Sequence, residues 1–165
     1  MEIDSLRKLY VEELKDIYSA EKQILQALPR MAKKTKNQEL RKAFEMHLEQ
    51  TRMQVERLDR IFEMLGKSPR GKKCKGMEGL IEEGKEMMQE DMEPDVMDAA
   101  LIASAQKVEH YEIASYGTVR TYANLLGEKD HARILQETLN EEGETDKQLT
   151  RLAESQINVE AMVGT

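Results

Sequence analysis

The chain has 165 residues, of which 35% are charged and 4% are aromatic, and its net charge at pH 7 is −7. This length predicts a single domain, residues 1–165, with enough chain to bury a core. The absence of Trp and the low counts of Gly and Pro favour helices over a β-sandwich or barrel. The negative charge argues against general nucleic-acid binding, which needs a clustered positive surface.

The single cysteine, Cys74, excludes an internal disulfide and predicts a reducing compartment. It lies in the basic stretch RGKKCK (residues 70–75), which is typical of a solvated loop and whose lysines could lower the pKa of the thiol. The N-terminal stretch lacks an apolar signal core, and no apolar run reaches the length of a membrane span. We therefore expect a cytoplasmic protein without a membrane partner.

Two long helices are predicted in the first half of the chain. Asp4 or Ser5 can cap a helix that runs to about residue 34, and the polar turn TKN leads into a second helix over 38–65 that Gly66 ends. Apolar residues recur in both at alternating spacings of three and four, as in an amphipathic helix. The predicted core stripes contain Leu14, Ile17, Glu21, Ile24 and Leu28 in the first helix, and Leu40, Phe44, His47, Thr51, Leu58 and Phe62 in the second.

The second half begins with a loop, GKSPRGKKCKG, and a short helix over 77–89. Pro94 suits the first turn of a third long helix that extends to about residue 126, where Gly127 ends it. A tight GEKD connection starts a fourth long helix over 130–157. Residues 158–165 are expected to form a loosely docked tail.

The lengths of the connections predict the topology. Two are short and join antiparallel neighbours, whereas the middle one, about 29 residues over 66–94, is long enough to cross the length of a bundle. The helices over 38–65 and 94–126 should therefore be parallel, and we expect both hairpin turns at the same end. The sequence thus predicts an all-α fold, a ferritin-like four-helix bundle with one long crossover containing a short fifth helix.

Polar residues interrupt the apolar stripe of every long helix. Glu112 lies at the centre of the stripe of the third helix, because successive residues are rotated by about 100°, and Glu109 lies toward one flank. Ionised Glu is rarely fully buried unless it is paired or binds a metal. The polar residues on the core faces are Glu21, His47, Glu112, Glu142 and Asp146, with Gln50 and Glu109 on the flanks.

These residues are also predicted to lie at one level of the bundle. Glu21 and Glu112 lie about four helical turns before their hairpin turns, Glu142 about four turns after, and His47 about three turns after. Mutually repelling buried carboxylates need a cation or protons, and no Lys or Arg lies on these stripes. The pattern therefore predicts a metal site in this layer, with Asp146 one turn further along. The alternatives for each residue alone are a helix–helix ion pair, a rim position or a hydrogen-bonded core histidine.

The sequence resembles the YciE/YciF-like bacterial proteins of the ferritin-like superfamily over nearly its whole length. The stretches that carry this resemblance are DIYSAEKQILQALPRMA, AFEMHLEQT with QVERL, MEGLIEEG, DAALIASAQKVEHYEIASYGT and ETLNEEGETDKQLTRLA. The resemblance implies a four-helix bundle with a two-metal carboxylate centre, a homodimer, and a link to bacterial stress responses. Transferred residue by residue, it implies Glu21, His47, Glu112, Glu142 and Asp146 as metal ligands.

The sequence departs from the family pattern at one ligand position. The helix motif, which in the family reads like H-L-E-E-T, is His47-Leu48-Glu49-Gln50-Thr51 here, so Gln50 can coordinate only as a neutral oxygen donor. Ferritins and rubrerythrins use an E-x-x-H pair on their second and fourth helices, whereas the fourth helix here has no His at the site. The expected site is therefore rich in oxygen and poor in histidine.

Two functions follow as hypotheses. An oxygen-rich site suits two divalent metal ions, Fe(II) best, with Mn(II) or Mg(II) as alternatives, and its expected chemistry is oxidation of Fe(II) by oxygen or peroxide. Glu112 and Glu21 would bridge or chelate, and His47 and Glu142 would complete the set of ligands of each ion. The remaining positions, or the layer around the ligands, would be filled by Asp146, Gln50 and Glu109. The alternative is a stress-related protein-interaction bundle whose metal site is vestigial or structural. Iron storage in a cage is the least supported, because the sequence shows no cage-forming surface.

Overall fold

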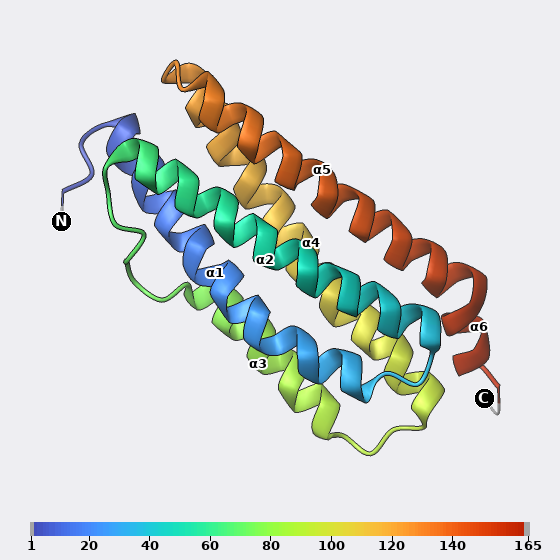
Figure 1. The fold of residues 1–165 in the computed structure, drawn as a ribbon. Coiled ribbons are helices and arrows are strands. Elements are labelled where there is room, and N and C mark those ends of the chain that lie inside the picture. Colours follow the sequence, from blue (N-terminus) through green and yellow to red (C-terminus); the bar gives the residue numbers. More distant parts are fainter. Residues whose placement is uncertain (1, 164–165) are drawn as a thin grey trace.

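The computed structural model describes residues 2–163, which form a bundle of long helices without any strand in that range (Figure 1). The elements in chain order are α1 (Leu6–Lys34), α2 (Gln38–Leu65), α3 (Lys75–Gln89), α4 (Pro94–Leu125), α5 (Lys129–Leu152), the π-helical segment η1 (Ala153–Ile157) and α6 (Asn158–Ala161). The hairpins α1–α2 and α4–α5 pack together through α1 against α4 and α2 against α5. The predicted all-α four-helix bundle, with one long crossover and a short helix within it, is confirmed.

Local hydrogen bonds explain where the first two helices begin and end. The Ser5 hydroxyl accepts a hydrogen bond from the Lys8 N–H at 3.2 Å, and the Asn37 side chain accepts one from the Leu40 N–H at 3.0 Å. Such N-cap contacts satisfy amide groups that have no partner within the helix. Gly66 ends α2 in the left-handed conformation, with φ of 63°, which a residue with a side chain rarely adopts.

The crossover helix α3 covers one side of the bundle, against α1 and α4. Cys74 caps it: the thiol accepts a hydrogen bond from the Met77 N–H at 3.4 Å and lies 3.0 Å from the Tyr111 hydroxyl. Gly76 permits this close approach, because a Cβ there would lie 2.8 Å from the Tyr111 ring. Burial raises the pKa of the Cys74 thiol, so the expectation that neighbouring lysines lower it is wrong.

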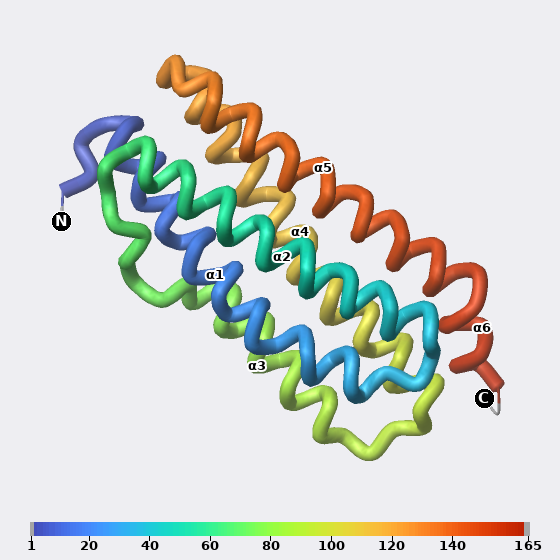
Figure 2. Tube along the Cα trace, viewed as in Figure 1, coloured from blue at the N-terminus to red at the C-terminus, as the bar shows by residue number. Residues whose placement is uncertain are grey.

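The two hairpin turns lie at opposite ends of the bundle, which corrects the expectation that they share one end (Figure 2). The first turn contacts the beginning of α4, where the Lys36 and Asn37 N–H groups donate to the Asp98 carboxylate at 2.9 and 2.8 Å. The second turn contacts the beginning of α1 through the Arg7–Glu128 ion pair. The first turn lies at the start of α2, and the second turn lies at the end of α4. Because α2 and α4 are parallel, the start of one and the end of the other lie at opposite ends of the bundle.

This correction does not remove the shared layer. The helices α1, α2 and α4 have 29, 28 and 32 residues, so a residue about four turns from either end lies near mid-bundle. Residues counted from the first turn, such as Glu21, and residues counted from the second turn, such as Glu112, therefore lie at the same level of the bundle. The convergence of the polar residues follows from the lengths of the helices.

The last predicted helix is divided in the structure. The α-helical part of α5 ends at Leu152, and η1 and α6 continue the chain and contact α4. Ile157 is buried in the core, whereas Val159 is exposed. The tail predicted over 158–165 thus begins with a helical turn, and its residues 164–165 lie outside the described range.

The core consists of two apolar clusters separated along the bundle. One is built around Ile24, Leu28, Phe44 and Leu101, and the other around Leu14, Leu58, Tyr116 and Leu135. Buried polar side chains of four helices lie between them, at Glu21, His47, Glu112 and Glu142. The bundle therefore places a polar layer inside an apolar core. None of the helices within residues 2–163 is long and apolar enough to cross a membrane.

Candidate metal centre

Five ionisable side chains from the four long helices converge in the polar layer. They are Glu21 of α1, His47 of α2, Glu109 and Glu112 of α4, and Glu142 of α5, and each is at most 4% exposed. Glu109 and Glu112 are three residues apart, so they lie on neighbouring positions of one helix face. The helical period thus brings a ligand-bearing face of every long helix to the same level.

Within this layer the side chains form two groups with metal-binding geometry. Glu21, Glu112 and Glu142 each offer an oxygen within 4.8 Å of the others, and His47, Glu109 and Glu142 offer a second such set. Glu142 belongs to both. Adjacent groups joined by a shared carboxylate are the arrangement that two-metal carboxylate centres use in helical bundles.

The hydrogen-bonding state of these atoms tests whether a cation fits. Both carboxylate oxygens of Glu21, Glu112 and Glu142, and Oε2 of Glu109, are buried without a hydrogen-bond partner among the described residues. His47 Nε2 lies 2.8 Å from Glu109 Oε1, but the geometry is not that of a hydrogen bond. Buried polar groups are normally satisfied, and carboxylates can accept several ligands at once. The donor set therefore fits metal ions that the protein would hold.

Burial sets the protonation state of the cluster in the absence of a cation. It raises the pKa of Glu21 to about 8 and the pKa of Glu109 to about 7. The pKa values of Glu112 and Glu142 are raised further, first by burial and then by the neighbouring carboxylates. Near neutral pH these groups must therefore hold either protons or a metal.

The other two predicted residues lie outside both groups. Asp146 is partly exposed: its Oδ2 lies 3.1 Å from His110 Nε2, and its Oδ1 accepts a weak hydrogen bond from Gln106 at 3.4 Å. Gln50 accepts a hydrogen bond from the Thr145 hydroxyl at 3.3 Å. Glu109, predicted as a flanking member, lies in the cluster, since the flank of α4 that carries it faces His47 of α2.

An ion pair beside the cluster was missed by the sequence reasoning. Arg57 of α2 binds both carboxylate oxygens of Glu141 on α5, at 2.5 and 3.1 Å, and Gln54 donates to the same carboxylate. The helical period alone turns Glu141 away from the stripe of α5 that carries Glu142, and Arg57 lies off the apolar stripe of α2. The sequence contains one indication of this pair: Arg57 directly precedes the core residue Leu58, and Glu141 directly precedes Glu142. This pair neutralises a carboxylate that directly precedes Glu142.

Comparison with known proteins agrees with this architecture. The chain is 47% identical to protein YciF of Escherichia coli K12 over 162 residues, which cover 98% of both chains. The crystal structure of this E. coli stress protein superimposes with a TM-score of 0.91, covering 94% of this chain and 99% of that one. A protein of Rhodopseudomonas palustris described as YcfI, a putative structural protein, has 44% identity and a TM-score of 0.88, covering 90% of this chain and 95% of that one.

A more distant structure, from Xanthomonas campestris, has 25% identity and a TM-score of 0.73 over 92% of both chains. The family model described as a domain of unknown function, DUF892, matches residues 5–162. This range includes every helix and the whole carboxylate cluster. The chain therefore belongs to the DUF892 family and is a homologue of the stress protein YciF.

Proposed function

We propose that this protein is a ferritin-like di-metal carboxylate protein of the stress response that oxidises Fe(II) with oxygen or peroxide. The observation that carries the proposal is the pair of ligand groups that share Glu142, with their oxygens buried and unpaired among the described residues. Homology to a stress protein supports the physiological setting.

The charges and donor atoms of the cluster favour two divalent ions. Four carboxylates and a neutral imidazole balance two ions of charge +2, which would relieve the repulsion among Glu21, Glu112 and Glu142. A set rich in oxygen with one nitrogen suits Fe(II), Mn(II) or Mg(II) better than Zn(II) or Cu(II). A bound iron pair would supply the electron transfer from Fe(II) to the oxidant. The chain would hold the ions with the two ligand groups that include Glu142, and its two apolar clusters would exclude bulk water.

A second candidate is a protein-interaction bundle whose carboxyl groups are held by protons. The raised pKa values of Glu21 and Glu109 favour it, because neutral carboxyl groups need no cation. The description of the R. palustris relative as a putative structural protein points in the same direction. The two candidates differ in whether the folded protein binds metal at this layer.

Metal content after anaerobic loading with Fe(II) distinguishes them. The parent should bind about two ions per chain. Glu142→Gln alters the ligand that both groups share and should abolish binding of both ions. Glu112→Gln should abolish binding of the ion held by Glu21, Glu112 and Glu142. Asp146→Asn is the matched control, since Asp146 lies outside both groups, and it should bind as the parent does.

Oxidation is then measured as oxygen or peroxide consumed per Fe(II), with Glu142→Gln as the inactive comparison. A parent that binds no Fe(II), while Glu142→Gln folds with unchanged stability, would favour the interaction bundle. Full metal binding without consumption of either oxidant would leave a metal site but reject the oxidase.

A further inference from the structure

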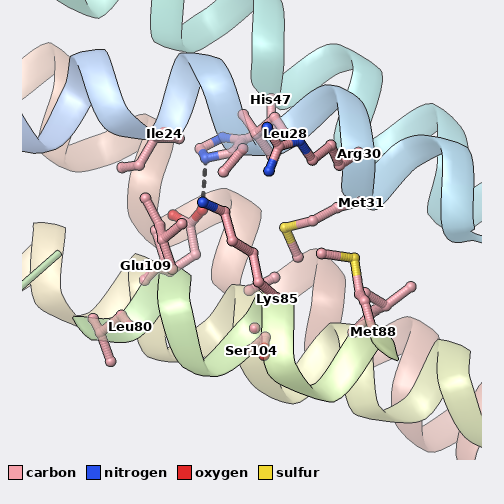
Figure 3. A pocket seen from close by; sticks show the side chains of 16 residues that line it. Ile24, Leu28, Arg30, Met31, His47, Leu80, Lys85, Met88, Ser104 and Glu109 are labelled. Atoms are coloured by element: carbon pink, nitrogen blue, oxygen red, sulfur yellow. Dashed lines mark ion pairs between the residues drawn. The ribbon is translucent and has the colours of Figure 1, made fainter. Parts of the chain in front are cut away.

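An apolar pocket lies between α1, α3 and α4 and ends at the carboxylate cluster (Figure 3). Its walls include Ile24, Leu28, Leu101 and Ala105, and its inner end is formed by His47 and Glu109. The volume is about 40 Å³, which exceeds the space that one water molecule requires but holds an alkyl chain only if lining side chains move aside. Because nearly all of the lining is apolar, water finds few hydrogen-bond partners there, so the pocket favours an apolar occupant.

Cationic side chains surround the outer end of this pocket. Arg30 and Lys85 line both this pocket and an adjoining open depression of about 420 Å³, to which Lys33 and Lys34 also contribute. Among the described residues, no acidic side chain lines this depression, although Glu78 and Glu82 line a neighbouring one with Arg30 and Lys85. None of the four cations takes part in an ion pair in this range, so they can accept an anionic partner at this place.

Two methionines connect the depression with the pocket. Met31 of α1 and Met88 of α3 line the pocket, and Met88 also lines the depression. In Figure 3 both side chains extend into the space between these helices. Methionine is unbranched and flexible, so it can move aside for an alkyl chain and still cover it.

We propose that this pocket and depression form a binding site for an amphipathic monocarboxylate of the fatty-acid type. The carboxylate lies on Arg30 and Lys85, and the alkyl chain passes Met31 and Met88 so that its end points toward His47 and Glu109. An alkyl chain accounts for the apolar lining, and the anionic head accounts for the cations at the mouth. Neither feature requires a bound metal, so the inference is independent of the proposed function.

The first experiment titrates the full-length, metal-free protein with octanoate and follows the methionine methyl groups by NMR. Met31 and Met88 should shift, whereas the exposed Met53 and Met64 on α2 should not. Octanol, which has the same chain without the charge, should bind more weakly, and acetate should not shift these methyl groups. Octanoate that leaves Met31 and Met88 unchanged would overturn the proposal.

Filling the pocket tests the place of the alkyl chain. A Cβ at Gly84 would lie 3.5 Å from the Ser104 hydroxyl, an ordinary contact, so Gly84→Leu introduces its side chain at the pocket without a clash at the backbone. It should weaken octanoate binding by roughly tenfold, the effect of losing burial of about two methylenes. Gly79→Leu is the matched control, because the same substitution on α3 meets nothing within 4 Å and should bind as the parent does.

Gly84→Ala provides a second variant in case the larger side chain perturbs folding, since Ala favours helix and fits the observed space. It should weaken octanoate binding in the same direction but less. Unchanged binding in both Gly84 variants would place the chain elsewhere and reject the site. Both variants should retain the metal content of the parent, so a failure of metal binding and a failure of this site can be distinguished.

The anionic head is tested by the double variant Arg30→Gln/Lys85→Gln. Octanoate should bind about fivefold more weakly, as expected for partly exposed ion pairs, while octanol binding stays unchanged. Lys42→Gln/Lys107→Gln removes two exposed charges elsewhere and serves as the control. Equal losses for octanoate and octanol would reject the proposed head contact. Methyl shifts that follow the dissociation of a dimer in light scattering would instead identify this face as an interface between copies.

Discussion

At the scale of the residue, Glu142 is the member of the carboxylate cluster that belongs to both ligand groups. Its carboxylate is fully buried and has no hydrogen-bond partner among residues 2–163. A charged carboxylate in such a position costs several kcal/mol unless a cation or a proton compensates it. Glu142 therefore requires either a bound cation or a proton in the folded protein.

His131 lies outside the cluster and permits a prediction about pH. Its Nδ1 is 3.0 Å from the Tyr10 hydroxyl, and burial lowers the pKa of the ring below its usual value of 6.5. Glu128 and Asp130 act in the opposite direction, and Arg7 in the same one, but burial dominates. The folded protein therefore favours neutral His131, so its contribution to stability is present above pH 6.5 and is lost as the pH falls through the folded pKa.

We expect the change in the free energy of unfolding from pH 7 to pH 5 to be less favourable in the parent than in His131→Phe, whose ring cannot titrate. The buried carboxyl groups of Glu21 and Glu109, whose pKa values are raised, add stability as the pH falls, but they do so in both proteins. One proton accounts for at most about 1.4 kcal/mol per pH unit of this difference. Urea denaturation at several pH values measures it. His110→Gln, a change at an exposed histidine, should keep the slope of the parent. Equal slopes for the parent and His131→Phe would show that His131 is not the group responsible.

At the scale of the element, Asp98 joins the first hairpin to α4. It is buried, and each of its carboxylate oxygens accepts a hydrogen bond from a backbone N–H of the turn between α1 and α2. The contact holds the turn between α1 and α2 against the second turn of α4. It also orients α2 relative to α4, which carry His47 and Glu109.

Asp98→Ala should destabilise the protein by about 2–4 kcal/mol, because it removes two charge-assisted hydrogen bonds and leaves the turn amides without these partners. Asp95→Ala, three residues earlier on α4, removes the exposed pair with Lys36 and an acidic residue of the first turn, and it should cost much less than Asp98→Ala. Urea denaturation measures both changes. Similar losses in the two variants would show that the turn does not depend on the Asp98 carboxylate.

At the scale of the whole molecule, the polar layer lies between two apolar clusters, and the same four long helices contribute residues to both clusters. A ligand that holds this layer together should therefore stabilise the entire bundle. A metal concentration of 100 times the dissociation constant adds about 2.7 kcal/mol per site, which corresponds to roughly 5–10 °C in melting temperature for a chain of this size.

We expect Mn(II), which avoids oxidation during the measurement, to raise the melting temperature of the parent by at least this amount. Glu142→Gln should show no such increase, and Asp146→Asn should show the full one. Differential scanning calorimetry with and without the metal provides the measurement. An equal increase in Glu142→Gln would mean that the metal acts at the acidic surface instead.

Much of the fold could be predicted from local sequence. Ser5 and Asn37 begin helices and Gly66 ends one, through hydrogen bonds and backbone conformations that depend on their immediate neighbours. The length of the connection over 66–94 decided that α2 and α4 are parallel. The period of each helix also placed Glu112 and Glu142 on its buried face.

The relations between helices were decided by tertiary structure. An angle of about 100° per residue fixes the direction of a side chain on its own helix, but it does not give the rotation of the neighbouring helix. For this reason Glu109 faces His47 and joins the cluster, whereas Asp146, on the predicted stripe, lies beside His110. The pocket beneath α3 depends in the same way on how three helices pack, and no single segment of the sequence encodes it.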